Sequence, residues 1–316
     1  MKFGVILTLF LGSLFTASAK TPVLSEEPRH EERGEIILKE ILSQPWSKDW
    51  EGATLEDVTL VKQKADLEVS TGLPPVWSAT ISGPDERTGH VMWDCWGEGR
   101  LVEFALDAEL KIEGDQAGAL TGVPGLQQFA MRDAEGRLVA SGCVPTAAGS
   151  VVAFWSSKQF PQWRGADGRT KADLAKRLRS RLTMTLYPDT DGFTENGMAL
   201  AGAFPGELAK ALRDDAREHE VPIACKIAKF SMAQLKEEIA AKRPVLLSCV
   251  VRVAHQPELS WGHEVAGVGW AKIDGVELAG VLDNFYPTRF PEAIRWIRGD
   301  AFRSIITLRP IVREKE

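Results

Sequence analysis

The chain has 316 residues, of which 44% are hydrophobic and 26% are charged, and its formal net charge is −6 at pH 7. This length allows more than one domain at about 100–200 residues each, and the composition excludes a wholly disordered chain. The acidic balance and the lack of a basic stripe exclude nucleic acid as an expected partner.

The first twenty residues have the pattern of a signal peptide. Lys2 is followed by an apolar run over residues 5–15, and residues 17–19 form a small-residue cleavage site. The run is short for a bilayer span, so an uncleaved anchor is the weaker alternative. We therefore expect residues 1–19 to be removed and the mature protein to be soluble, secreted or periplasmic, with no stable membrane span.

The segment after the signal has one helical pattern, which is followed by several strand patterns. Residues 22–33 are rich in charge and proline and predict a mobile lead-in, and apolar spacing predicts a helix over residues 36–42 that Pro45 stops. Strand-like runs separated by turn residues follow at residues 77–82, 89–95 and 101–106. These elements predict a small α+β unit.

Helices dominate the next part of the chain. A buried helix is expected directly after Cys143, since Pro145 suits a first helical position and apolar residues recur at helical spacing behind it. Two more helices are predicted at residues 171–182 and 204–218. Another begins at Ser231, where Gln234 completes a capping-box pattern.

Strands dominate the last part of the chain. The predicted strands lie at residues 245–251, 262–270, 276–285 and 304–308, the last of them closing the sheet. Asp274-Gly275 between two of these runs is a hairpin signal. Helices followed by an antiparallel sheet are typical of the α+β class. With a linker at residues 113–118, the sequence predicts one domain at 20–115 and a second at 116–316.

Cys143 is the candidate nucleophile. The positive end of a helix and its free N–H groups favour a thiolate, which is the reacting form of cysteine. Gly142 before it permits an unusual backbone angle or a close approach. The alternative is a buried or disulfide-bonded cysteine that caps the helix.

The other cysteines leave a disulfide question open. An exported protein with four cysteines could pair all of them, whereas a working Cys143 allows at most one disulfide. Cys225 and Cys249 flank the helix that begins at Ser231 and could pair with each other, although Cys95 competes with either.

His263 is the candidate base, and two residues compete to orient its ring. It lies between Gly262 and a strand of small residues, about 120 residues after Cys143, where it could form a thiolate–imidazolium pair. Asp283 ends the strand that the hairpin pairs with this one, and we prefer it to its neighbour Asn284, which alternation puts on the opposite face. An ordinary turn aspartate is the alternative.

The oxyanion of such a reaction needs hydrogen-bond donors. The backbone N–H of Cys143 is one candidate, and the side-chain amide of Gln127 or Gln128 is the other. Spacing alone does not choose between the two glutamines.

Four short motifs together resemble the papain-like cysteine peptidases. Residues 142–148 (Gly-Cys-Val-Pro-Thr-Ala-Ala) are similar to the nucleophile motif of the C39-like family and to that of streptopain-like peptidases. Residues 262–269 resemble the stretch around the family's histidine, and residues 282–284 stand where it has Asn-Asp-Pro. Residues 123–128 (Val-Pro-Gly-Leu-Gln-Gln) resemble its Val-Pro-x-x-x-Gln.

The resemblance implies a papain-like fold, with a helical half carrying Cys143 and an antiparallel sheet carrying His263 and Asp283. It implies cleavage of a peptide or protein substrate through a thioester acyl-enzyme, with Gln128 at the oxyanion and no metal or organic cofactor. Streptopain-like enzymes carry a pro-segment, so residues 20–115 are expected to restrain or shape the site. The alternatives are an inactive papain-fold binding protein, a transglutaminase-like or amidase-like acyl transferase, and a disulfide-stapled structural protein.

Overall fold

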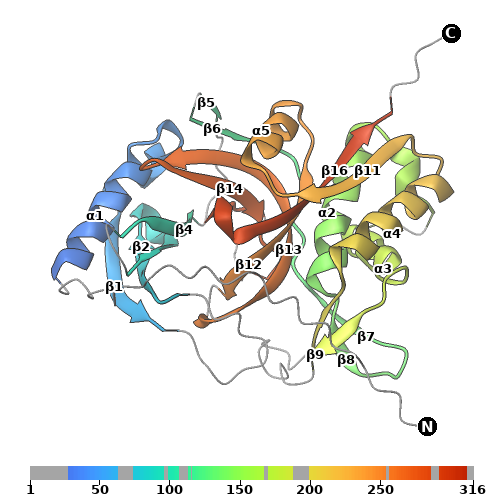
Figure 1. Ribbon diagram of the computed structural model, residues 1–316, viewed down its shortest axis with the longest axis horizontal. Coiled ribbons are helices and arrows are strands. Elements are labelled where there is room, and N and C mark those ends of the chain that lie inside the picture. The colour runs from blue at the N-terminus through green and yellow to red at the C-terminus, as the bar shows by residue number, and fades with distance from the viewer. Residues whose placement is uncertain are drawn as a thin grey trace, which may run out of the picture.

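The computed structural model describes residues 28–62, 74–95, 99–106, 113–114, 116–166, 170–187, 199–253, 256–285 and 292–311. The predicted signal peptide lies outside these residues, and its removal stays a prediction. Among the described residues no helix combines the length and the apolar character needed to cross a membrane. The fold is α+β, with one large sheet flanked by helices (Figure 1).

Twelve described strands form the large sheet, and all of their pairings are antiparallel. Ten of them follow one another in space in the order β1 (Thr54–Val61), β2 (Val76–Ser82), β3 (Thr88–Asp94), β4 (Leu101–Leu106), β15 (Arg295–Arg298), β14 (Val276–Leu282), β13 (Gln256–Ile273), β12 (Val245–Val253), β16 (Phe302–Pro310) and β11 (Ile223–Lys229). The predicted strands are confirmed, except that β14 ends at Leu282 instead of residue 285. β16 does not close the sheet, because β11 pairs with its outer side. β15 was not predicted from the sequence.

The predicted linker is wrong. Within residues 113–118, β5 (Glu113–Gly114) pairs with β6 (Ala117–Ala119), and β6 in turn pairs with β13. The backbone at residues 113–114 and 117–118 therefore belongs to the sheet instead of running free between two units. The domain boundary at residues 115/116 stays a prediction, but described strands from both sides of it share one sheet.

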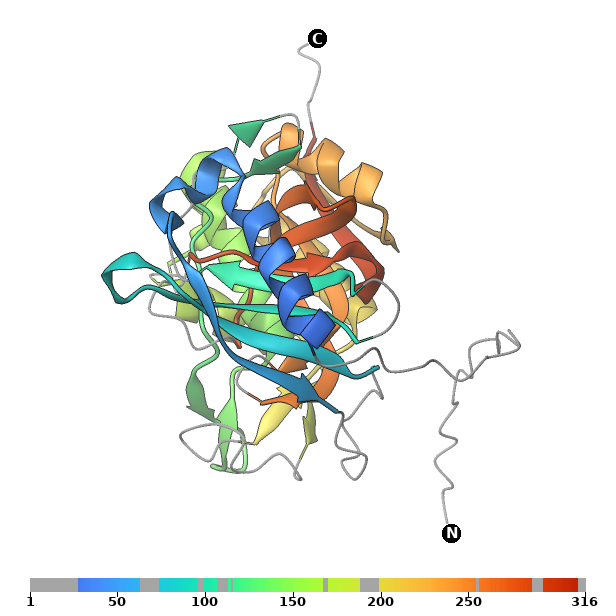
Figure 2. The same cartoon turned by 90° about the vertical axis from the view of Figure 1, so that its left-hand side faces the viewer.

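The N-terminal part consists of α1 (Pro28–Leu42), η1 (Pro45–Trp50), β1 to β4 and the short η2 (Pro84–Glu86). The predicted helix is confirmed, but it starts earlier than expected. The interpretation of residues 22–33 as a mobile lead-in is wrong for residues 28–33, because Pro28 opens α1, a position that proline favours. The helix lies across β1 to β4 (Figure 2) and buries Ile37, Leu38 and Ile41.

The other helices are α2 (Cys143–Lys158), α3 (Lys171–Arg179), α4 (Pro205–Glu218), α5 (Met232–Ala240), η3 (Pro161–Arg164) and η5 (Gly299–Ala301). All four predicted α-helices are thus confirmed. Ser231 is the N-cap of α5, but its side chain makes no capping hydrogen bond, so the expected capping box is absent there. Thr170 and Asp173 form a capping box at the start of α3. Two small antiparallel strand pairs, β7 (Ala130–Arg132) with β8 (Leu138–Ala140) and β9 (Thr185–Tyr187) with β10 (Leu200–Gly202), complete the described fold.

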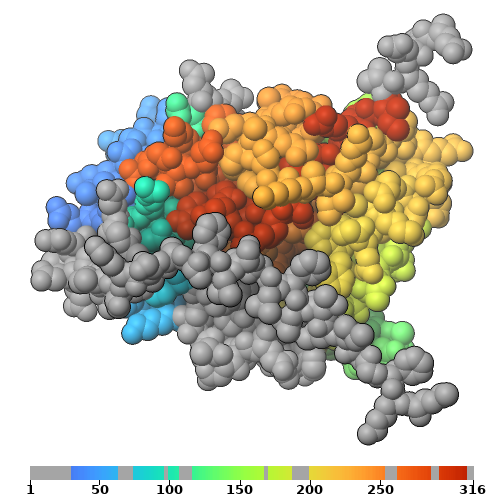
Figure 3. Space-filling view, viewed as in Figure 1, coloured from blue at the N-terminus to red at the C-terminus, as the bar shows by residue number. Residues whose placement is uncertain are grey.

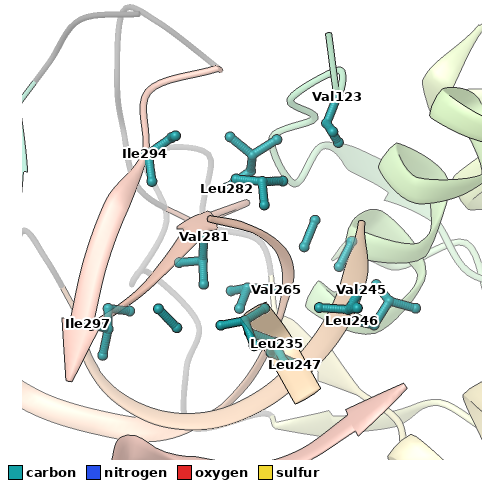
Figure 4. Packing of buried hydrophobic residues seen from close by; sticks show 14 of the residues in the cluster. Val123, Leu235, Val245, Leu246, Leu247, Val265, Val281, Leu282, Ile294 and Ile297 are labelled. Atoms are coloured by element: carbon teal, nitrogen blue, oxygen red, sulfur yellow. The ribbon is translucent and has the colours of Figure 1, made fainter. Parts of the chain in front are cut away.

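One hydrophobic core runs through both parts of the molecule, from Ile37 in α1 to Leu308 in β16. Buried side chains of β12, β13, β14 and β15 converge with Val123 and with Leu235 of α5 (Figure 4). Fully burying one such Val, Leu or Ile side chain stabilises a fold by about 1.5–3 kcal/mol. The sheet and α2, which packs against β12 and β13, therefore form a rigid base for the site.

Candidate active site

Cys143 is the first residue of α2, and the backbone before it is fixed. Gly142 has φ of 91°, and a Cβ there would lie 2.7 Å from Met184 Cε and 2.9 Å from Ala201 O, so only glycine fits. The Thr146 hydroxyl donates to Gly142 O over 2.5 Å. Cys143 is only partly buried, whereas every residue of α2 from 144 to 156 is buried. The thiol therefore stands at the positive end of a core helix.

The other three cysteines differ from Cys143 in burial. All four cysteines lie in the described part of the chain and are free, but Cys95, Cys225 and Cys249 are buried. Burial raises the pKa of the Cys95 thiol, that of Cys225 to about 11, and that of Cys249 well above its usual value. The Cys225–Cys249 disulfide considered from the sequence is absent, because β16 lies between β11 and β12.

His263 lies on β13 with its side chain 3% exposed. Its Nε2 donates to Asp283 Oδ1 over 2.9 Å, and its ring also makes a hydrogen bond with Cys143. Burial alone lowers the pKa of His263, but the charge of Asp283, the hydrogen bond with it and the hydrogen bond with Cys143 together raise this pKa to about 10. The ring can therefore carry a proton while it faces the thiol.

Asp283 follows the last residue of β14, and both oxygens of its carboxylate accept hydrogen bonds. Oδ1 accepts from His263 and from the N–H of Phe285 (2.9 Å), while Oδ2 accepts from Arg295 Nη1 over 2.5 Å. Burial raises the pKa of Asp283, but the charges of His263 and Arg295 and these hydrogen bonds hold it well below its usual value. The structure thus brings Asp283 and His263 together, as the sequence predicted.

Asn284 does not bond to the His263 ring. Its Nδ2 donates to Glu264 O over 2.9 Å and to Cys143 O over 3.2 Å, so it ties the start of α2 to β13. Its Oδ1 accepts from Gln128 Nε2 over 3.0 Å. Asn284 therefore positions the backbone that carries Cys143 and His263.

Both candidate glutamines lie against the Asp283–Asn284 turn. The backbone N–H of Gln128 donates to Asn284 O over 2.8 Å, and Gln127 Nε2 reaches Asp283 O over 3.4 Å. Through Asn284, the Gln128 amide is one side chain away from the Cys143 backbone. The role of Gln128 at an oxyanion stays a prediction.

Two residues of this buried cluster were missed from the sequence, Arg295 on β15 and Glu103 on β4. Arg295 Nη2 donates to both oxygens of Glu103 over 2.7 and 2.8 Å, and its Nη1 holds Asp283. His90 also reaches Glu103, with its Nε2 3.0 Å from Oε1. A carboxylate inside the apolar run Leu-Val-Glu-Phe-Ala-Leu was the available signal for Glu103.

Glu264, the neighbour of His263, is a buried carboxyl on the other side of the strand. Its Oε2 accepts from Ser248 Oγ over 2.5 Å, while its buried Oε1 has no partner among the described residues. Burial raises the pKa of Glu264 to about 7, although Ser248 and the charge of His263 lower it. An ionised Glu264 therefore costs the folded state free energy.

Replacing Glu264 by glutamine should stabilise the protein above pH 7. The pKa of Glu264 rises from 4.5 to about 7 on folding, so wild-type stability falls as pH increases through that interval. At pH 8 the variant should gain up to about 3 kcal/mol in unfolding free energy over the wild type, and little near pH 4.5. Urea unfolding at both pH values measures this, with the exposed Glu51→Gln as control. Equal destabilisation at both pH values would contradict it.

Metal ligands do not gather in the site. Within the described ranges, no three His, Cys, Asp or Glu side chains are grouped as a metal ion would require. The chemistry available to the described residues is that of a thiol, an imidazole and a carboxylate in line.

Comparisons with known proteins add little to this geometry. Neither a protein-family model nor a curated protein matches the chain. Among solved structures, the chain is similar to the active wild-type interpain A cysteine protease of Prevotella intermedia, with 11% sequence identity and a TM-score of 0.36, over 60% of this chain and 94% of that one. A similarity of this extent assigns no family, and the site is argued from its own residues.

Proposed function

We propose that the chain is an exported cysteine peptidase of papain-like type. The observation that carries the proposal is the position of the His263 ring, which is hydrogen-bonded to Cys143 on one side and to Asp283 on the other. Cys143 lies at a helix start, where a negative charge is stabilised in general, and Asp283 favours a positive imidazole. These are the two charge states that a thiolate–imidazolium pair requires.

In the proposed reaction, Cys143 Sγ attacks the carbonyl carbon of a peptide bond. The C–N bond breaks as the His263 imidazolium gives its proton to the leaving amine, and a thioester remains on Cys143. Water then loses a proton to His263 and attacks the thioester, which releases the acid and restores the thiolate–imidazolium pair. The backbone N–H of Cys143 and the amide of Gln128 are the proposed donors to the oxyanion.

Three features support a peptidase over an inactive binding protein of the same shape. The nucleophile is the partly exposed member of four free cysteines. The imidazole and carboxylate are buried as a charged pair, and because desolvating such a pair costs free energy, its presence favours a function over a purely structural role. The motifs around Cys143, His263 and Asp283 also resemble those of papain-like peptidases. Export to the periplasm or the medium is part of the proposal and rests on residues 1–19.

Thiol labelling tests the proposal without knowledge of the substrate. Iodoacetamide at pH 6, followed by mass-spectrometric mapping, should modify Cys143 at least about tenfold faster than Cys95, Cys225 or Cys249, because only a thiolate reacts readily. His263→Gln should remove this advantage, since the thiolate loses its imidazolium partner.

His219→Gln is the matched control, because His219 lies at the end of α4 and its ring bonds to Asp215 O and not to Cys143 or Asp283 in the described contacts. It should leave the labelling unchanged. Slow labelling of Cys143 in the wild type, at a rate that His263→Gln leaves unchanged, would remove the catalytic claim.

A further inference from the structure

Four buried side chains form a line of alternating charge that leaves the candidate site and ends in the N-terminal part of the chain. The line runs from His263 on β13 to Asp283, then to Arg295 on β15 and Glu103 on β4. The side chains of these four residues are between 2% and 4% exposed. An arrangement of four buried ionisable groups is costly to desolvate, so it calls for an explanation.

We infer that Glu103 and Arg295 are positioning residues for the reaction, and that β4 of the N-terminal part is therefore a component of the active site. The inference rests on the proposed function and names two residues that act on Cys143 and His263 through Asp283. Neither residue touches the thiol in the described contacts.

The geometry of Arg295 is fully determined by its partners. One edge of its planar guanidinium holds Glu103 through Nε and Nη2, and Nη2 also donates to Arg252 O over 2.9 Å. Nη1 is then aimed at Asp283 Oδ2. Because a guanidinium presents its donors in a fixed fork, holding one edge fixes the other. Asp283 is consequently held with its second oxygen toward His263.

The charge of Glu103 is as necessary as its geometry. A lone Arg295 beside Asp283 would neutralise the carboxylate that supports the His263 imidazolium, and would do so in a medium of low dielectric. The negative charge of Glu103 offsets the positive charge of Arg295, so the negative charge of Asp283 remains available to stabilise the His263 imidazolium. The charged or titratable groups that face this line from neighbouring elements are His90, Arg252, Glu264, Cys249 and Cys143.

Backbone pairing explains how such distant residues meet. β4 pairs with β15 in the register Trp296↔Phe104 and Ile297↔Glu103, which places Glu103 and Arg295 as diagonal neighbours on one face. The rings of Phe104 and Trp296 stack at 6.1 Å between centroids. Atoms of the N-terminal part lie directly against those of the C-terminal strands in the space-filling view (Figure 3).

The test compares Glu103→Gln with the wild type by the rate at which iodoacetamide alkylates Cys143 at pH 6 and pH 10. At pH 6 the thiolate exists only as the partner of an imidazolium, so the variant should react at least about threefold more slowly. At pH 10 a thiol ionises without help, and the two rates should converge. The control is Glu56→Gln, which replaces an exposed glutamate on β1. Its Cys143 should be alkylated at the wild-type rate at both pH values.

The outcomes separate the two proposals. A wild-type Cys143 that is unreactive at pH 6 overturns the proposed function. A reactive wild type with a Glu103→Gln rate that is unchanged, or lowered equally at both pH values, overturns the positioning role alone, because a merely structural defect has no reason to disappear at pH 10.

A folding defect in Glu103→Gln would be seen by circular dichroism, and a second variant then carries the test. The double variant Glu103→Leu/Arg295→Met replaces both members of the ion pair by apolar residues, so neither Glu103 nor Arg295 is left as an unpaired buried charge. Proteins often tolerate such a replacement. Asp283 loses its anchor in this double variant, so alkylation of Cys143 at pH 6 should fall at least about fivefold. A rate within twofold of the wild type overturns the inference.

Discussion

Replacing Cys143 by alanine should lower the hydrolysis of casein by at least about 10³-fold, because the acyl-enzyme cannot form without the sulfur. The fold should survive, since Cys143 is the first residue of α2 and only partly buried, and alanine keeps its backbone. The measurement is the release of acid-soluble peptides by purified variant and wild type, with circular dichroism as the check on folding.

Cys225→Ala is the matched control for this experiment. Cys225 lies on β11, where its thiol is buried and takes no part in the contacts of Cys143 and His263. Its loss should cost stability and leave the hydrolysis per folded molecule unchanged. Casein hydrolysis that persists in Cys143→Ala would mean that another group, or another protein in the preparation, performs it.

Replacing Asp283 by asparagine should lower kcat/KM by about 10²–10⁴-fold, the range expected when a buried carboxylate that orients a catalytic imidazole is lost. An amide has one oxygen, so it can accept from His263 or from Arg295, and its NH2 group then faces the other donor. The change also leaves the buried Arg295 with Glu103 as its only carboxylate partner among the described contacts, in place of two.

The same substitution should cost about 3–5 kcal/mol of stability at neutral pH, as expected for breaking a buried ion pair. The pKa of Asp283 is lowered from 3.8 on folding, so its stabilisation is fully present above about pH 4 and is lost as pH falls. The stability gap between wild type and variant should therefore narrow below pH 4. Denaturant unfolding at pH 7 and pH 3 measures it, with the exposed Asp49→Asn as control. A gap that stays constant with pH would show that Asp283 acts by shape alone.

The sequence was sufficient to identify the candidate site residues whose local surroundings are unusual. A cysteine between a glycine and a helical apolar run, a histidine after a glycine on a strand of small residues, and a carboxylate at the end of an apolar strand can each be recognised within a few positions. The hairpin signal at Asp274-Gly275 then predicts that the strands of His263 and Asp283 are neighbours, and they are. Local pattern and pairing rule agree here, so the prediction needed no long-range information.

The sequence was insufficient where the chemistry depends on distant pairing. Glu103 and Arg295 are 192 residues apart, and β15 is a four-residue strand with an arginine at each end, which gives no alternation to recognise. The linker at residues 113–118 was misread for a similar reason, because its glycines and charges favour a turn while β13 supplies a partner from far along the chain. In both cases a tertiary contact outweighs the local preference.

The pairing of β4 with β15 limits how the protein can be matured by proteolysis. A cut that released α1 to β4 would turn β15 into an edge, with open N–H and C=O groups and the indole of Trp296 uncovered, a surface prone to aggregate. Arg295 would lose Glu103, one of its two carboxylate partners, in the same step. Proteolysis that discarded this segment would therefore lower solubility, so we expect the mature chain to keep α1 to β4.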